Sequence, residues 1–425
     1  MVNSTQIVPA FQKKPFFKQF WWIFLIVAVA AGTTVLIVVR SRGDSSETKS
    51  TDDIQSGPED GITDDPQTGE NSLPACPDTT EGLFTNYLVE PDTLGAIEPL
   101  GNVNGIDHIL PVDHVYFISY ENGGTGGAPI YAPADIYITD VTSHQLFDSS
   151  GRMPDKPAQY YFYADVCNGL RIWVSGVGEL SPELQMAWDQ AEKAHSEDAS
   201  GSTIYSINEA TRPNIWLHAG DLIGYTHVDE SIEITVTNQN LAPREDVDWS
   251  YYADASTRSH IMCFADLYAE DMKAEYYTKF GMYRTTDGFV PRTIEPLCGE
   301  VIQNISGTIQ GDWFIDKPEN ENDGMEKAGK TLTFIHMNYD PTVGIISIAG
   351  TITDETMRIE YEPKHSGNID RETSETITGQ IYCYNTDQGI KIIAGLIDDH
   401  HLRIESQTGS CKTAETFDNP YIFER

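Results

Sequence analysis

Hydrophobic and polar positions divide this chain into distinct stretches. An unbroken apolar run begins at Phe20 and ends at Val39. Residues 43–75 are Asp, Glu, Ser, Thr, Gly and Pro with almost no large apolar side chain. From residue 76 onward, short segments of alternating apolar and polar residues are separated by Gly, Asn and Asp. The pattern predicts a membrane-anchoring helix, a disordered acidic stalk and a mainly β body with a few helices.

The apolar run is long enough to cross a bilayer as a helix. About twenty residues at about 1.5 Å each match a hydrocarbon core of about 30 Å. Trp21 and Trp22 lie at one end, and three lysines precede the run while two arginines follow it. This balance predicts a short cytoplasmic tail, residues 1–19, and a carboxy-terminal ectodomain outside the cell membrane. A cleaved signal peptide is the alternative, but the run exceeds the usual signal core and lacks a small-residue cleavage site.

Two domains are predicted after the stalk, residues 76–292 and 293–425. The first mixes strands with helices, which are predicted over 180–195 and over the Tyr-rich stretch 262–281. Ser181 is the N-cap of the first helix and Pro182 lies in its first turn. Its predicted strands, rich in β-branched and aromatic residues, are 114–120, 128–141, 159–166, 170–177, 214–225 and 231–238.

The second domain is predicted to be all β, an antiparallel barrel or sandwich. Its strands are expected at 301–309, 331–339, 344–352, 357–363, 379–385, 389–397 and 401–407. The GDWF segment that ends at Phe314 is similar to the Gly-x-Trp that opens lipocalin-like barrels, a resemblance over residues 299–425. In that family an arginine near the chain end packs over the indole, so Arg403 and Arg425 are candidates; a plain core tryptophan is the alternative. An eight-stranded barrel has room for side chains or one small apolar ligand.

Charge and cysteine content place the body in an exported setting. The chain carries 65 acidic and 27 basic residues, a formal charge of -38, which disfavours nucleic acid as a partner. All six cysteines follow the apolar run, an even number that predicts disulfides in an oxidising compartment; reduced, buried thiols are the alternative. The pairing cannot be derived from sequence, but proximity favours Cys263 with Cys298 and Cys383 with Cys411, which leaves Cys76 with Cys167. Asn304 begins an Asn-Ile-Ser sequon, a glycosylation candidate.

Two segments of the first domain resemble lysostaphin-type (LytM-like) endopeptidases. APIYAPADIYITDV, from Ala128, looks like their PVYAPADGTV element, and HAGDLIGY, from His218, is similar to their V-x-AGD-x-IG element. The resemblance covers residues 102–238 and implies a barrel-sandwich hybrid. Activity in that family depends on zinc held by a His-x3-Asp pair and the second histidine of an HxH strand.

The zinc ligands of that family are not matched here. Asp107 stands in the aspartate position, but Val103 occupies the preceding histidine position. Ser231 and Glu233 replace the two histidines of the HxH strand. The resemblance therefore implies a degenerate, non-catalytic module.

Other imidazole and carboxylate side chains define an alternative metal site. His108, Asp113, His114 and His218 would bind zinc if they converged, although no known zinc spacing is met. Turn formation is the competing interpretation of these residues. We expect no cofactor, and zinc enters only under the alternative of a peptidoglycan or peptide hydrolase.

The sequence as a whole predicts a single-pass cell-surface protein that binds or scaffolds the envelope. Its expected partners are the membrane, through the run from Phe20 to Val39, and a cell-wall, glycan or surface-protein component. The alternatives are the zinc hydrolase and a carrier of small apolar ligands in the second domain.

Overall fold

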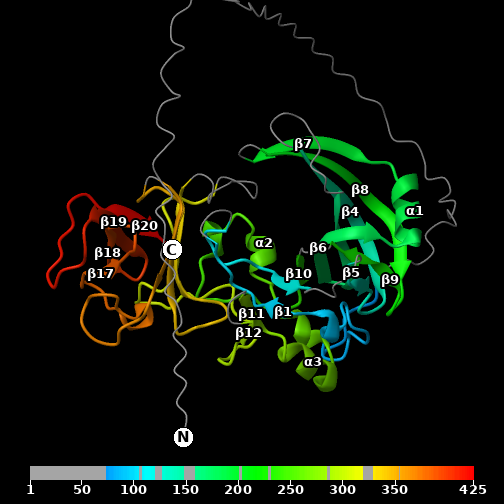
Figure 1. The fold of residues 1–425 in the computed structure, drawn as a ribbon, viewed down its shortest axis with the longest axis horizontal. Coiled ribbons are helices and arrows are strands. Elements are labelled where there is room, and N and C mark those ends of the chain that lie inside the picture. Colours follow the sequence, from blue (N-terminus) through cyan, green and yellow to red (C-terminus); the bar gives the residue numbers. More distant parts are fainter. Residues whose placement is uncertain are drawn as a thin grey trace, which may run out of the picture. The chain divides into compact units, whose positions relative to one another are not determined.

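The computed structural model describes residues 73–104, 108–119, 127–147, 158–200, 203–227, 231–284, 288–318, 329–353 and 355–425 (Figure 1). The predicted tail, the apolar run from Phe20 to Val39 and the stalk up to residue 72 lie outside the described residues. Among the described residues, no helix has the length and apolar character needed to span a bilayer. Residues Glu70–Arg425 form one compact unit.

Ten strands build the first sheet, in the order β1-β2-β10-β6-β5-β4-β8-β7, with β9 paired to β6 and β3 paired to β9. The strands are β1 (Ala96–Glu98), β2 (Val115–Ile118), β3 (Pro129–Tyr131), β4 (Ile136–Phe147), β5 (Gln159–Cys167), β6 (Leu170–Leu180), β7 (Ala194–Ser200), β8 (Thr203–Leu217), β9 (Leu222–Thr226) and β10 (Ser231–Asn238). All the named pairings are antiparallel.

Alternation along β5 shows how the sheet divides into two faces. Phe162, Ala164 and Val166 are buried in the hydrophobic core. Tyr163 and Asp165 point to the opposite face, because successive side chains of a strand alternate. One face of this sheet therefore packs on the core and the other carries polar and aromatic side chains.

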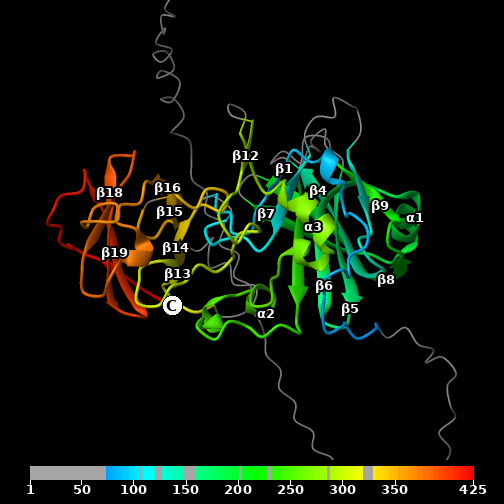
Figure 2. The same cartoon turned by 90° about the horizontal axis from the view of Figure 1, so that it is seen from below.

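Helices cover the ends of the sheet. In α1 (Pro182–Gln190) the Leu184 amide donates to the Ser181 hydroxyl at 3.3 Å, which confirms the predicted N-cap. The helix contacts β6 and β8 and lies beside β9 in Figure 2. It ends earlier than the pattern over 180–195 predicts, since β7 begins at Ala194.

The remaining helices are short. They are η1 (Pro91–Thr93), η2 (Trp249–Tyr251), α2 (Ala255–Arg258), η3 (Phe264–Leu267), α3 (Glu270–Tyr277) and η4 (Thr373–Glu375). Phe264 and Tyr276, from η3 and α3, pack against Phe117 of β2 with ring centroids 4.9 and 5.7 Å away. A two-stranded sheet of β11 (Gly281–Arg284) and β12 (Gly288–Pro291) follows.

Eight antiparallel strands form a nearly closed barrel in the order β16-β15-β14-β13-β20-β19-β18-β17. They are β13 (Gly311–Phe314), β14 (Thr331–His336), β15 (Gly344–Ile348), β16 (Met357–Tyr361), β17 (Tyr382–Asn385), β18 (Ile390–Asp398), β19 (His401–Thr408) and β20 (Tyr421–Glu424). Buried side chains pack its core, including Trp313, Phe334, Ile346, Tyr384, Ile392, Leu402 and Phe423.

The prediction of a strand over 301–309 is wrong. The Thr308 amide donates to the Ile305 carbonyl at 3.2 Å, which closes a turn instead. The Arg425 guanidinium donates to the carbonyls of both Ile305 and Thr308, at 3.0 and 2.9 Å. The carbonyls of this segment therefore bond within a turn and to a side chain, in place of a neighbouring strand.

The six cysteines form three disulfides, Cys76 with Cys167, Cys263 with Cys298, and Cys383 with Cys411. All three pairs agree with the prediction, in which proximity gave two pairs and Cys76 with Cys167 remained.

Contacts between the η2 segment, which follows the first sheet, and the barrel are aromatic and polar. Phe314 of β13 packs against Tyr251 and Tyr252, with ring centroids 5.5 and 5.0 Å away. The Tyr252 hydroxyl donates to the fully buried Asp312 at 2.9 Å, and the Thr333 hydroxyl donates to the same carboxylate at 2.6 Å. Burial raises the pKa of Asp312 above its ordinary value, although these hydroxyls and the Arg258 charge oppose that rise.

Candidate functional site

The two segments that resemble lysostaphin-type peptidases lie side by side. β3 pairs with β9, which places Ile130 opposite Gly224. The Ala132 amide donates to the Asp221 carbonyl at 2.9 Å, and the Gly220 amide donates back to the Ala132 carbonyl at 2.8 Å. Gly224 is required here, because a Cβ would lie 2.1 Å from the Glu179 carbonyl oxygen.

His218 belongs to this paired element and is not part of a metal cluster. Its Nδ1 lies 3.3 Å from Asp135, and its side chain is 82% exposed. The Asp135 carboxylate also accepts a hydrogen bond from the Ala219 amide at 3.0 Å. This arrangement fixes the turn between β8 and β9.

The other three metal candidates lie near one another, at the start of β2. The Nδ1 of His114 is 3.0 Å from Asp113, its Nε2 is 2.9 Å from the Tyr116 hydroxyl, and its ring centroid is 5.7 Å from that of His108. Both nitrogens of His114 therefore have protein partners. In the part of the chain that the structure describes, no three His, Cys, Asp or Glu side chains are grouped as a metal ion requires.

The positions that the lysostaphin resemblance assigns to zinc ligands do not fit that ion. Val103 is buried in a small apolar cluster with Ile335 and Met337. On β10, Glu233 accepts a hydrogen bond from the Ser175 hydroxyl at 2.7 Å. Asp107 lies outside the described residues. The Val103 side chain has no atom that can bind a metal ion, and Glu233 is a carboxylate bonded to serine, so these two positions do not reproduce the imidazole ligands of that family.

A groove of about 700 Å³ lies on the polar face of the first sheet. Its floor is made by cross-strand rows of β5, β6 and β10. One row aligns Asp165 with Arg171 and Arg171 with Thr237, and the next aligns Tyr163 with Trp173 and Trp173 with Thr235. The described residues that line it are Leu73, Asp113, His114, Tyr163, Asp165, Asn168, Gly169, Arg171, Trp173, Thr235, Thr237, Gln239, Ser256 and Thr257.

Aromatic rings border one another along this floor. The Trp173 ring lies 6.4 Å from the Tyr163 ring and 6.1 Å from the Tyr161 ring, tilted by 38° and 33°. His114 approaches Trp173 edge-on at 6.0 Å. The rings are neighbours in a row and are not stacked face to face, so the indole is not covered by a parallel ring.

An ion pair crosses the hairpin that links β5 and β6. The Arg171 Nε donates to Asp165 at 2.7 Å, and a second guanidinium nitrogen reaches the other carboxylate oxygen at 3.3 Å. The bond to Asp165 raises the pKa of Arg171 above its ordinary value, more than burial lowers it. The guanidinium also lies 5.8 Å from the Tyr163 ring centroid, a cation–π distance.

The wall beside His114 is held by a buried arginine. Arg258 of α2 bonds the carboxylate of Asp254 at 3.0 Å and also donates to the Pro111 carbonyl. Burial acts to raise the pKa of Asp113, but the bond with His114 and the charge of Arg258 lower it below its ordinary value. Asp113 is therefore a carboxylate at neutral pH, and the segment before β2 is locked in place.

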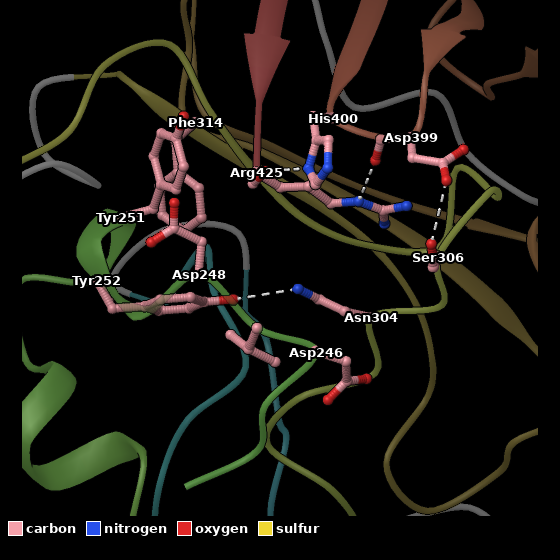
Figure 3. Close-up of a pocket in the computed structure, with 11 residues that line it drawn as sticks. Asp246, Asp248, Tyr251, Tyr252, Asn304, Ser306, Phe314, Asp399, His400 and Arg425 are labelled. Carbon is pink, nitrogen blue, oxygen red and sulfur yellow. Dashed lines mark hydrogen bonds between the residues drawn. The ribbon is translucent and has the colours of Figure 1, made fainter.

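A second cavity, of about 60 Å³, lies where Tyr252 and Asn304 meet the end of β20 (Figure 3). Arg425 reaches it across the Trp313 indole, with the guanidinium carbon 4.2 Å from the ring centroid. Burial lowers the pKa of Arg425 to about 10. Of the two arginines predicted to cover Trp313, Arg425 does so, whereas Arg403 lies over Phe417 at 5.0 Å.

The sequon asparagine lines this second cavity. The Asn304 side-chain oxygen accepts the Asp312 amide at 2.9 Å, and its nitrogen points toward the Tyr252 hydroxyl at 3.5 Å (Figure 3). The cavity has the volume of about two waters in the liquid. It is too small for an organic ligand, so the larger groove is the candidate site.

Four residues of the groove floor were not identified from the sequence: Tyr163, Asp165, Arg171 and Trp173. A signal was present, since Tyr-x-Asp and Arg-x-Trp stand on either side of a tight turn and each pair shares one face of a strand.

No family model, no curated protein and no solved structure matches the chain.

Proposed function

We propose that this protein is a single-pass, membrane-anchored protein of the cell surface whose folded part binds a component of the envelope, without catalysing a reaction. The groove on the open sheet face carries the proposal. It offers two rings, an ion pair and several hydroxyl and amide groups on rigid strands, as expected of a preorganised binding site.

The location of the groove supports the same proposal. Thr235 and Thr237, which line the groove, share one face of β10 with Glu233, the position that the resemblance assigns to a zinc ligand. A degenerate peptidase would keep the surface that receives its substrate and lose the metal. Three disulfides and the acidic composition suit an oxidising exterior.

Retention on isolated cell envelopes tests this function. Full-length protein in neutral-lipid nanodiscs is mixed with envelopes of the producing cell, and the bound fraction is measured after centrifugation. We expect Tyr163→Ala together with Trp173→Ala to weaken retention at least tenfold, because the groove loses both rings. Tyr421→Ala is the matched control, since Tyr421 is 44% exposed and Tyr163 is 43% exposed, but Tyr421 lies on β20. Equal retention of all three proteins would exclude the groove as the binding surface.

A further inference from the structure

We propose that the ligand of the groove is an uncharged carbohydrate chain, with one sugar ring against Trp173 and its hydroxyl groups bonded to Asp165 and Arg171. This inference rests on the proposed function, because it names the class of ligand for the same groove.

The aromatic row supplies a surface for a sugar ring. A pyranose has an apolar face of C–H groups, and such a face packs on the flat, electron-rich face of an indole or phenol ring. The Trp173 ring of β6 has two neighbouring rings on β5, those of Tyr161 and Tyr163, and Tyr163 is 43% exposed. A ring lying on Trp173 would therefore have Tyr163 beside it for a second contact.

The ion pair provides hydrogen bonds at the edge of that ring. The Asp165 side chain is 17% exposed and the Arg171 side chain 45% exposed, so both border the groove while they hold each other in place. A sugar hydroxyl donates and accepts at once, and a carboxylate beside a guanidinium offers both functions to neighbouring hydroxyls. Because the pair is already fixed by its own bonds, binding costs little side-chain entropy.

Charge argues for an uncharged chain. Among the described residues that line the groove, Arg171 is the only Lys or Arg, and Asp165 already neutralises it. Asp113 adds a further negative charge. A polyanion would therefore be repelled by the groove and by the net charge of -38.

The composition of the lining also disfavours a proline-rich peptide. Such peptides bind in grooves lined mainly by aromatic side chains. Of the fourteen described residues that line the groove, ten are polar and Leu73 is the only aliphatic one. Hydroxyl and amide side chains, such as Thr237, Gln239 and Asn168, instead match a ligand that presents many hydroxyl groups.

Selective destruction of the ligand distinguishes these classes. Envelopes are treated with periodate, which cleaves carbon–carbon bonds between adjacent hydroxyl-bearing carbons of sugars, or with a broad protease, and are offered to the full-length protein in nanodiscs. We expect periodate to reduce groove-dependent retention at least tenfold and protease to leave it unchanged. Trp173→Phe should restore part of the retention that Trp173→Ala loses, and Tyr421→Ala should behave like the unmodified protein.

The outcomes separate the two proposals. Groove-dependent retention that survives periodate and is lost after protease would overturn the carbohydrate inference and leave the binding function intact. Retention that is the same with and without the groove rings would overturn both. An array of uncharged glycans then serves as the direct probe, with anionic polysaccharides as the class expected not to bind.

Discussion

Two tryptophans on neighbouring sheets show how differently the two regions of this protein use one residue type. Trp173 of β6 lies on the open face of the first sheet and lines the groove. Trp313 of β13 is fully buried, its indole nitrogen donates to the Ile309 carbonyl at 2.8 Å, and Arg425 covers its ring. The sheet turns one face toward solvent, whereas the barrel curves around its core. The surroundings of the ring, and not the strand that carries it, decide whether it stabilises the fold or is available to a ligand.

The largest expected effect comes from truncating these two rings in turn. Trp313→Ala should lower the free energy of unfolding by about 3–5 kcal/mol, because it leaves a cavity in the barrel core. Trp173→Ala should lower it by less than about 1.5 kcal/mol and instead weaken ligand binding, since its ring is only partly buried. Urea denaturation followed by circular dichroism measures both. Equal losses of stability would contradict the different roles assigned to the two tryptophan rings.

A smaller effect is expected at the junction between them. Tyr252→Phe removes one donor from the fully buried Asp312 and should cost about 1–3 kcal/mol at neutral pH. The pKa of Asp312 is raised in the folded protein, so the folded state favours its proton, and stability falls as pH rises through that pKa. The loss should therefore be smaller below the raised pKa of Asp312 than above it. Tyr163→Phe, which changes an exposed hydroxyl, is the control; a pH-independent loss would contradict the role of Asp312.

The last effect concerns Glu372, which contacts His336 of β14. Burial acts to raise the pKa of Glu372, but hydrogen bonds from His336 and Ser374 lower it from 4.5 to about 2. A depressed pKa contributes stability that is present above pH 4.5 and is lost as pH falls toward 2. Glu372→Gln should therefore flatten this part of the stability curve. Glu362→Gln, an exposed change, should leave the curve as it is; if both variants kept the full acid dependence, Glu372 would not be its source.

Local patterns in the sequence were enough to predict much of the fold. Period-two alternation located β10 over 231–238, the helix signals at Ser181 were correct, and the three disulfides are the predicted pairs. Strands such as β7 and β20 escaped prediction. The segment AHSEDAS of β7 carries almost no apolar side chain, and β20 is only four residues long.

The groove depends on information that local patterns do not hold. Its floor joins Arg171 and Thr237, which are far apart in the chain and become neighbours only through the register of β6 and β10. Its walls come from Asp113, in the segment between β1 and β2, and from Thr257 of α2, which follows the last strand of the sheet. Register is set by the packing of all the strands together, so a single sequence without the paired sheet does not reveal the site.

The Cys76–Cys167 disulfide has a mechanical consequence. It joins the start of the folded part, which follows the predicted stalk, to the end of β5, two residues from Asp165. The Asn168 amide bonds the Pro74 carbonyl at 2.9 Å, and Leu73 itself lines the groove. Under the proposed function, tension between the membrane anchor and a bound ligand would pass through this covalent bond into the hairpin that carries Asp165 and Arg171. The hydrogen bonds of the other strands and of the barrel would then carry little of this force.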